Sequence, residues 1–123
     1  MIRGVRGATS VRANQAEEIV ERSFHLVKEI VNVNHIKPEH VVSVYFTATE
    51  DLNDAFPAKS LRRLEGWTHV PVMCMREINV PNSLPRCIRV MITVQTDKNQ
   101  KEIQHIYHHE AKQLRPDLQS GEE

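Results

Sequence analysis

Apolar residues recur at helical spacing in one long segment near the start of the chain. Between Asn14 and about Val33 they fall on one face of a helix. The stripe consists of Val20, Phe24, Val27 and Val31, widened by Ile19 and Ile30. Asn14 is a suitable N-cap, and Glu17 three residues later completes a loose capping box. We therefore predict a helix from Asn14 to about Val33.

Other segments alternate apolar and polar residues or are rich in β-branched side chains, which is the pattern of strands. The predicted strands are residues 2–8, 41–47, 70–75, 87–96 and 111–114. The alternation is clearest in 87–96. The face of that strand that we expect to pack against the helices carries Ile88, Val90, Ile92 and Val94. The opposite face carries Arg89, Met91, Thr93 and Gln95.

Two further helices are predicted, one from Pro57 to about Leu64 and ended by Gly66, and a short one over 99–107. Two main helices on one mixed sheet of about five strands make an α+β fold, with the other sheet face free for partners. No repeat or linker interrupts the chain, so we expect a single domain over 1–118. Residues 119–123 are predicted to form a flexible polar tail.

Charge and composition exclude several classes of function. The chain has 123 residues, with 16 Lys plus Arg against 16 Asp plus Glu. This neutral balance argues against nucleic-acid binding and against a polybasic membrane anchor. No apolar run approaches a membrane span, and the first residues lack the apolar core of a secretory signal, so we expect a cytoplasmic protein. Two cysteines, Cys74 and Cys87, make no disulfide framework.

Arginine outnumbers lysine ten to six, which favours discrete anion contacts over a diffuse basic surface. Arg89 is the most informative, because it lies within an apolar strand and must find an anion or water. An ion pair at a subunit interface is the simpler explanation. The alternative is a guanidinium aimed into a shielded cleft, where its charge acts at low dielectric. Because a chain this short has little room for a deep pocket, that cleft would lie between subunits.

Other basic residues are weaker candidates for anion contacts. Arg6 precedes Gly7, which would let a ligand or another backbone approach closely, although a solvated arginine is the alternative. The predicted helix at Pro57 carries a group of basic residues that can lie on one helix face. Such a group usually forms a solvated surface. This group comprises Lys59, Arg62 and Arg63. Phe56, just before it, is either a core residue or a ring against a ligand.

Nucleophile, metal and cofactor chemistry have little support in the sequence. Cys74 and Glu77 would point to opposite faces of a regular strand, so they face one site only if the chain bends near Arg76. No histidine is placed to act as a base for Cys74, which disfavours a cysteine nucleophile. The seven histidines show no recognisable zinc spacing, and there is no glycine-rich phosphate loop. This pattern favours a protein that binds a small anion and shapes its conformation, with no metal or cofactor.

Five separated segments resemble, in order, those of the AroH class of chorismate mutase. They are IRGVRGAT (2–9), FPAK (56–59), VPVMCM (70–75), CIRVM (87–91) and LRPDL (114–118). The resemblance covers about residues 2–118. It implies a homotrimeric pseudo α/β barrel with three active sites at subunit interfaces. It also implies an isomerase that converts chorismate to prephenate, the branch step toward phenylalanine and tyrosine, without a cofactor, metal or nucleophile.

The same resemblance implies catalytic roles for Arg89, Arg6 and Glu77. Arg89 would hydrogen-bond the ether oxygen, where negative charge develops as the C–O bond breaks. Arg6 would bind a substrate carboxylate and hold a folded, chair-like geometry. Glu77, with Cys74 nearby, would accept a hydrogen bond from the ring hydroxyl. The expected substrate-binding residues are Cys74, Tyr107, Phe56, Ala58, Lys59, Arg62, Val72, Met73, Leu114 and Arg115.

The chain departs from the family pattern in three places. Met73 stands where threonine is familiar, and Asn82 stands where glycine is common. The third departure is a group of more polar residues near the last predicted strand, namely His108, Lys112 and Gln113. These changes affect expectations for the tail and leave the catalytic residues untouched.

Two alternatives stay open beside the enzyme. One is a non-catalytic binder of small carboxylates. The other is a structural oligomerisation domain, in which Arg6 and Arg89 pair with carboxylates of neighbouring subunits. The enzyme hypothesis requires Arg89 to be shielded from solvent where two protomers meet. A guanidinium in bulk water, or one locked to a carboxylate of its own protein, would contradict it.

Overall fold

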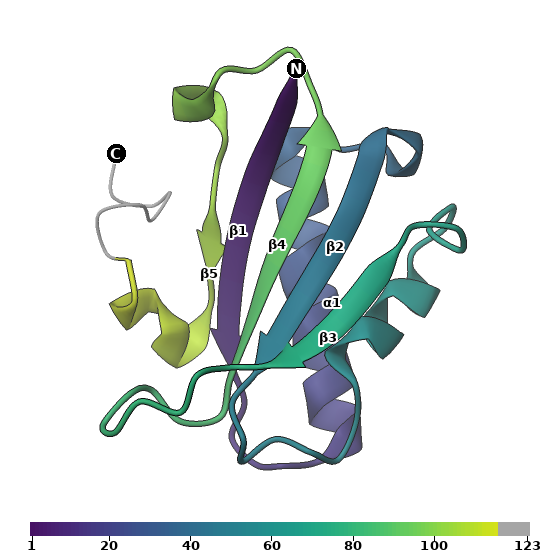
Figure 1. Cartoon of the computed structure of the whole chain (residues 1–123). Helices are drawn as coiled ribbons and strands as arrows, with labels where there is room; N and C mark the ends of the chain where they lie inside the picture. The colour runs from purple at the N-terminus through teal and green to yellow at the C-terminus, as the bar shows by residue number, and fades with distance from the viewer. Residues whose placement is uncertain (116–123) are drawn as a thin grey trace.

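The structure, a computed structural model, describes residues 1–115 and is built around one five-stranded sheet (Figure 1). The strands are β1 (Ile2–Ser10), β2 (Val41–Ala48), β3 (Val72–Arg76), β4 (Cys87–Gln95) and β5 (Ile106–Tyr107). Their order across the sheet is β3-β2-β4-β1-β5. β4 runs antiparallel to β1 and β2, whereas β3 and β5 run parallel to β2 and β1. The predicted mixed sheet is confirmed.

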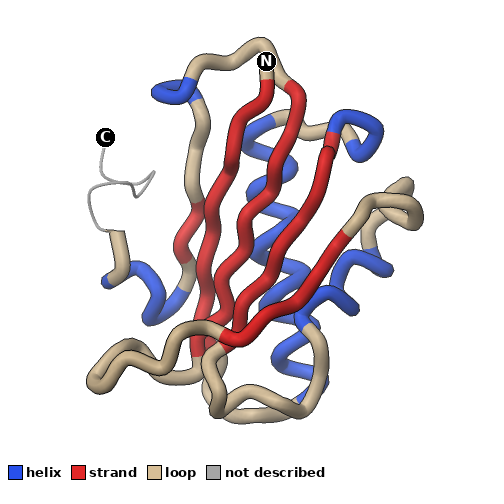
Figure 2. Tube along the Cα trace, in the orientation of Figure 1, coloured by secondary structure: helices blue, strands red, loops and turns tan. Residues whose placement is uncertain are grey.

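One long helix, α1 (Ala16–Asn34), crosses one face of the sheet, and shorter helical segments lie at the margins (Figure 2). The shorter segments are 3₁₀ helices: η1 (Pro38–His40), η2 (Pro57–Arg63), η3 (Gln100–Glu102) and η4 (His109–Gln113). The two main helices of the prediction correspond to α1 and η2, and the α+β fold is confirmed. α1 covers one face of the sheet only. The opposite face is called here the open face.

The core lies between α1 and the sheet. The residues of β4 predicted to face the helices are at most 3% exposed: Ile88, Val90, Ile92 and Val94. The residues of α1 that meet them are fully buried: Ile19, Leu26, Val27 and Ile30. Of the predicted stripe, Val20, Phe24 and Val31 lie at the margin. Lys28 Nζ and the Arg63 guanidinium each lie 5.6 Å from the centre of the Phe24 ring.

The predicted N-cap of α1 is wrong, because Asn14 is bound to another loop. The helix begins at Ala16 after Gln15, which makes no capping side-chain bond. Asn14 Oδ1 accepts the backbone N–H groups of Asn53 and Asp54. The Asp54 carboxylate in turn accepts the Ala16 N–H at 2.7 Å. A carboxylate distant in sequence therefore caps the helix.

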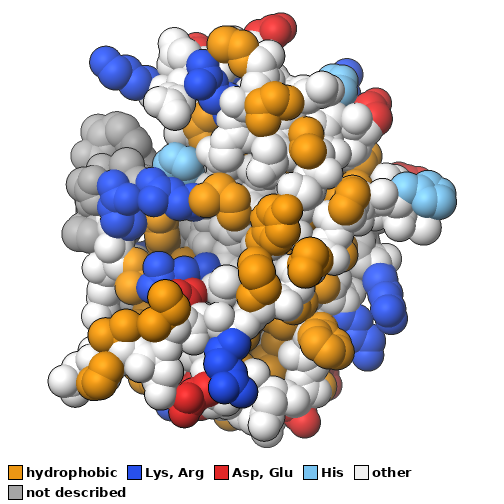
Figure 3. All heavy atoms as spheres, viewed as in Figure 1, with side chains coloured by type: hydrophobic (Ala, Val, Ile, Leu, Met, Phe, Trp, Pro, Cys, Tyr) orange, Lys and Arg blue, Asp and Glu red, His pale blue; other side chains and the backbone are white. Residues whose placement is uncertain are grey.

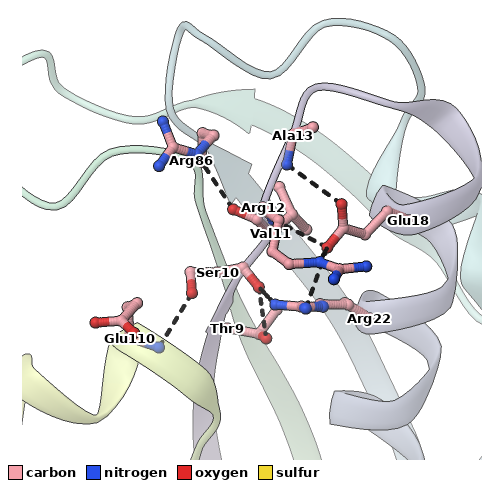
Figure 4. A network of polar contacts seen from close by, with 9 residues as sticks. All are labelled: Thr9, Ser10, Val11, Arg12, Ala13, Glu18, Arg22, Arg86 and Glu110. Carbon is pink, nitrogen blue, oxygen red and sulfur yellow. Dashed lines mark hydrogen bonds and ion pairs between the residues drawn. The ribbon is translucent and has the colours of Figure 1, made fainter.

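The turn from β1 into α1 is held by Glu18 (Figure 4). Its carboxylate accepts the backbone N–H groups of Arg12 at 2.9 Å and Ala13 at 3.2 Å. It also lies 3.2 Å from Arg22 Nη2, one helical turn further on. Arg22 Nη1 donates to the Ser10 carbonyl at 2.7 Å. This network fixes the end of β1 relative to the helix.

The prediction fails most after residue 98. The helix predicted over 99–107 is a single turn, η3, closed by a capping box between Asn99 and Glu102. The chain then extends and pairs with β1 as β5. The strand predicted over 111–114 is wrong, because 109–113 form η4. Long-range pairing with β1, rather than local periodicity, decides this region.

Gly7 allows a close approach, but by the protein's own core rather than by a ligand. It lies on the α1 side of β1, where a Cβ atom would come within 2.6 Å of Ile30 Cδ1 and 3.2 Å of Leu26 Cδ1. The same atom would meet the Ile106 carbonyl oxygen at 3.1 Å. The missing side chain therefore lets α1 and β5 pack tightly against β1.

Within residues 1–115, no helix has the length and apolar character needed to cross a membrane. The predicted tail, 119–123, lies outside the described residues, as do the last three residues of the LRPDL segment.

Candidate active site

Strand register brings Arg6, Arg89 and Tyr107 to the open face. Ala8 pairs with Arg89 on β4 and with Tyr107 on β5, and Arg6 pairs with Met91. Residues paired in this way present their side chains to the same face of a sheet. The prediction that Arg89 faces away from the helices is confirmed. Figure 3 shows basic side chains beside hydrophobic ones on this face.

Glu77 also reaches the open face, although it follows the end of β3. Its backbone N–H donates to the Ala48 carbonyl, which continues the pairing with β2. Its Oε1 accepts a 2.6 Å hydrogen bond from the Thr47 hydroxyl and lies 3.5 Å from Arg89 Nε. We call Arg6, Glu77, Arg89 and Tyr107 the open-face cluster.

One chain does not shield Arg89 from water. Its side chain is 47% exposed, against 25% for Glu77. The carboxylate that it meets belongs to its own chain, but that carboxylate is Glu77, itself a predicted site residue, and the contact is to the Nε edge. The shielded guanidinium expected from the sequence is therefore not formed by a single copy.

The thiol of Cys87 lies beside Arg89 on the same strand and is 3% exposed. Burial raises its pKa, although the charge of Arg89 and a hydrogen bond with that side chain oppose the rise. Burial also raises the pKa of the Cys74 thiol, against an opposing hydrogen bond from the Ala58 backbone. Both thiols therefore stay protonated at neutral pH, which supports the view that neither is a nucleophile.

Tyr107 sits in a small apolar cluster on the open face. It is 9% exposed and packs with Ala8 and Ala111, with Leu84 and Leu114 at the edge. The Glu110 backbone N–H donates to Ser10 Oγ at 3.1 Å, which ties η4 to the end of β1 (Figure 4). The start of the C-terminal segment, with the predicted residues Leu114 and Arg115, is thereby held next to the open-face cluster.

The remaining predicted residues line a separate groove. This groove lies between η2, the loop before it and β3, and has a volume of about 1440 Å³. The predicted residues that line it are Phe56, Ala58, Lys59, Arg62, Val72 and Cys74. Met73, which points to the open face, is 59% exposed and is not among them. We call this feature the β3 groove.

The two sets lie on opposite faces of the sheet within one chain. Cys74 pairs with the buried Phe46, whereas Arg89 pairs with Thr47 on the open face. Cys74 and Glu77, expected near one ring hydroxyl, are therefore not brought together by a single copy. The structure joins Arg6, Glu77, Arg89 and Tyr107 on one side, and the groove residues on the other.

Three residues near the open-face cluster were missed by the sequence reasoning. Thr47 binds Glu77, Cys87 contacts Arg89, and His105 Nδ1 accepts the Arg6 backbone N–H at 2.9 Å. The alternation of β2 could have placed Thr47 on the open face. Its partner could not have been found in this way, because the path of the chain beyond β3 is not periodic.

The departures from the family pattern have local structural explanations in two cases. Asn82 adopts φ 67°, a left-handed conformation that glycine favours and asparagine tolerates. His108 Nε2 lies 2.5 Å from Glu29 Oε1 on α1, so its polarity is used in a contact between the residue after β5 and the helix. Gln113 donates to Glu110 within η4.

Among residues 1–115, no three His, Cys, Asp or Glu side chains are grouped to hold a metal ion. The open-face cluster offers two guanidinium groups, one carboxylate and one phenol. The fold and these side chains define a small α+β protein whose open face carries the charged and hydrogen-bonding groups that suit an anionic ligand.

Comparison with known proteins identifies the family. Residues 2–118 match the sequence model described as Chorismate mutase type I, and the chain belongs to this family. It is 51% identical over 118 residues to Chorismate mutase AroH of Bacillus subtilis (strain 168), covering 96% of this chain and 93% of that protein. It is 42% identical over 123 residues to Chorismate mutase AroH of Thermus thermophilus, covering 99% and 100%.

A solved structure agrees with this assignment. The chorismate mutase from Clostridium thermocellum Cth-682 superposes with a TM-score of 0.87 at 47% sequence identity. The match covers 89% of this chain and 97% of that chain. The resemblance found in the sequence is confirmed.

Proposed function

We propose that this chain converts chorismate to prephenate at a site that two copies of the chain build together. This isomerisation, a step of aromatic amino-acid biosynthesis, is the activity of the family to which the chain belongs. One observation carries the placement of the site. The open-face cluster and the β3 groove hold complementary sets of candidate residues on opposite faces of the sheet.

Exposed apolar residues support a second copy on the open face. Those on β2, β3 and β4 are Tyr45, Met73, Met75 and Met91, each at least 38% exposed. The loop after β3 adds Ile78 at 78% and Val80 at 54%. A patch of this kind is typical of protein–protein interfaces. We expect a homotrimer with the arrangement of a pseudo α/β barrel, in which each open-face cluster meets the β3 groove of a neighbour.

The reaction sets modest chemical demands on the protein. The C–O bond of the ether bridge breaks while a C–C bond forms within the same molecule, so no proton, electron or group is exchanged with the enzyme. Negative charge grows on the ether oxygen as its bond lengthens. In this proposal Arg89 donates to that oxygen through the nitrogens that its Glu77 contact leaves available. A fixed cation there stabilises the transition state more than the ground state.

The other residues bind and fold the substrate. Arg6 holds a carboxylate and so restricts the flexible side chain of chorismate to a chair-like geometry. Glu77 accepts a hydrogen bond from the ring hydroxyl, and Tyr107 donates to a carboxylate. The groove of the neighbour supplies the walls with Phe56, Ala58, Val72 and Cys74, and positive charge with Lys59 and Arg62. Met73 on the open face and Arg115 at the mouth complete the substrate-binding set. Leu114 covers the entrance.

No cofactor is needed for this chemistry, because the substrate contains both the bond that breaks and the atoms that form the new one. We further propose a cytoplasmic location. The thiols of Cys74 and Cys87 are both unpaired, which supports a reducing compartment.

The proposal is tested by following the loss of chorismate's ultraviolet absorbance with the purified full-length protein. We expect acceleration over buffer, with prephenate as the product. No acceleration would overturn the proposal. If calorimetry then found tight chorismate binding with the ligand intact, a non-catalytic carboxylate binder would replace it.

A further inference from the structure

The backbone N–H of Arg6 is bound by a side chain rather than by a carbonyl of a neighbouring strand. β5 pairs with β1 at Gly7 and Ala8, and the pairing stops there. His105, the residue before β5, places its ring where the next carbonyl would be needed. Its Nδ1 accepts the Arg6 N–H at 2.9 Å. The ring thus adds one hydrogen bond between the segment of β5 and Arg6, whose guanidinium belongs to the open-face cluster.

The backbone on both sides of His105 is anchored. Asn34, buried at the end of α1, donates to the Gln104 carbonyl and accepts the Gln104 N–H, both at 2.9 Å. On the other side Ile106 and Tyr107 are 3% and 9% exposed. The ring is therefore carried by anchored backbone, which places Nδ1 opposite the Arg6 N–H.

The hydrogen bond also defines the protonation state of the ring. Because Nδ1 accepts, it carries no proton, and the single ring hydrogen is on Nε2. Burial lowers the pKa of His105, and the charges of Arg6 on β1 and Arg115 after η4 lower it further. The ring is therefore neutral at neutral pH, which is the form that the contact needs.

We propose that His105 is a positioning residue for substrate binding, which holds Arg6 in place through Nδ1. This inference rests on the proposed function, since Arg6 is the residue assigned there to a carboxylate. Arg6 binds that carboxylate in the ground state and in the transition state alike. A displaced Arg6 therefore weakens the binding of both states equally. The loss then appears in KM and leaves kcat nearly unchanged.

Protonation of the ring has two opposing effects. The added charge attracts the substrate carboxylate, which favours binding. However, a protonated Nδ1 would point its hydrogen at the Arg6 N–H, so two donors would face each other at 2.9 Å and the pair would separate. The geometric loss is the larger effect in this proposal, because the displaced ring moves toward solvent, where its charge is screened.

Two variants test the role of the acceptor. His105→Asn keeps an oxygen at the place of Nδ1 but cannot titrate near neutrality, whereas His105→Leu keeps bulk without an acceptor. We expect His105→Leu to raise KM about tenfold, with kcat within about twofold of the wild type. We expect His105→Asn to restore KM. As the pH is lowered from 8 into the acidic range where the ring is protonated, the wild-type KM should rise, while the KM of His105→Asn should not.

The proposal is overturned if His105→Leu keeps the wild-type KM, if His105→Asn is as impaired as His105→Leu, or if the wild type and His105→Asn share one pH profile of KM. Should His105→Leu fail to fold, the comparison of the wild type with His105→Asn across pH still decides. Wild-type turnover is measured first. If it is absent, the proposed function fails, and calorimetric affinity for chorismate in the same variants tests the His105 contact separately.

Discussion

The Thr47 hydroxyl donates a 2.6 Å hydrogen bond to Glu77 Oε1, the same oxygen that lies 3.5 Å from Arg89 Nε. The carboxylate is therefore shared between a short neutral donor and a longer charged contact. Because the hydroxyl holds the oxygen on the β2 side, it limits how closely Glu77 and Arg89 can neutralise each other. In the proposed mechanism the terminal nitrogens of Arg89 are the ones that meet the ligand.

Thr47→Val tests this arrangement, because valine suits a strand and has almost the same shape. Without the hydroxyl, the Glu77 carboxylate should move onto the Arg89 guanidinium. We expect kcat to fall about tenfold, the magnitude expected for losing a hydrogen bond to a charged group. Thr47→Ser keeps the hydroxyl and should stay close to the wild type. Wild-type kcat in Thr47→Val would show that Glu77 is held by other means.

Arg89 itself should be indispensable for rate. Arg89→Ala removes the cation that meets the developing oxygen charge, and we expect kcat to fall by about 10³-fold or more. Arg89→Lys should also lose most of kcat, because an ammonium cannot keep the Glu77 contact at one edge and reach the substrate with the rest of a planar fork. Thermal unfolding of both variants checks that the fold is kept. Near-normal turnover in both would remove Arg89 from its role.

A site shared by two copies can be tested by mixing inactive variants. Lys59→Ala alters the β3 groove, and Arg89→Ala alters the open-face cluster. If each site of a trimer takes one half from each of two neighbours, a site is intact when its open-face half comes from Lys59→Ala and its groove half from Arg89→Ala. Unfolding and refolding an equal mixture should therefore restore about a quarter of the sites. If both halves came from the same chain, the mixture would be no more active than the average of the two variants refolded separately.

The sequence was most informative where burial has a simple period. In β4 the alternation predicted both the buried face and the open position of Arg89, because a strand covered on one side can satisfy only one register. It was least informative where a contact distant in sequence decides the local structure. Asn14 has the chemistry of an N-cap but binds the loop at Asn53, and no local pattern reveals that competition.

The end of the chain shows the same limit. β5 has two residues, too few for any periodicity, and is defined by pairing with β1 and by the Asn34 contacts to Gln104. The same holds for the candidate site. Motifs could name Arg6, Glu77 and Arg89, but the residues that hold them, Thr47 and His105, depend on register and on the path of the chain.

Gly7 should be required for stability. In Gly7→Ala the new methyl group would lie 2.6 Å from Ile30 Cδ1 and 3.1 Å from the Ile106 carbonyl oxygen, so the Ile30 side chain and its packing against β1 would have to rearrange. We expect a loss of about 1–3 kcal/mol in the free energy of unfolding, measured with urea at a fixed protein concentration. Gly4→Ala is the matched control, because Gly4 lies on the exposed side of the same strand, where its nearest atom is Met91 Sδ at 3.1 Å. Equal losses in the two variants would contradict the packing argument.

Glu18 should make stability depend on pH. Burial raises the pKa of its carboxyl, but the hydrogen bond from the Arg12 backbone and the charge of Arg22 outweigh burial, and the pKa lies below the ordinary value of 4.5. The unfolded chain therefore binds this proton more readily than the folded one. The stabilisation is complete above pH 4.5 and is lost as the pH falls through the lower, folded pKa.

Glu18→Gln removes the charge while keeping one acceptor for the turn between β1 and α1. At pH 7 we expect it to lower the free energy of unfolding by about 1 kcal/mol. At a second, acidic pH, low enough to protonate the wild-type carboxyl, the difference between the two proteins should shrink. Urea unfolding of both at the two pH values, at one protein concentration, measures this. An equal difference at both would mean that Glu18 acts through its shape, because a role for the carboxylate charge requires the gap to close as the proton binds.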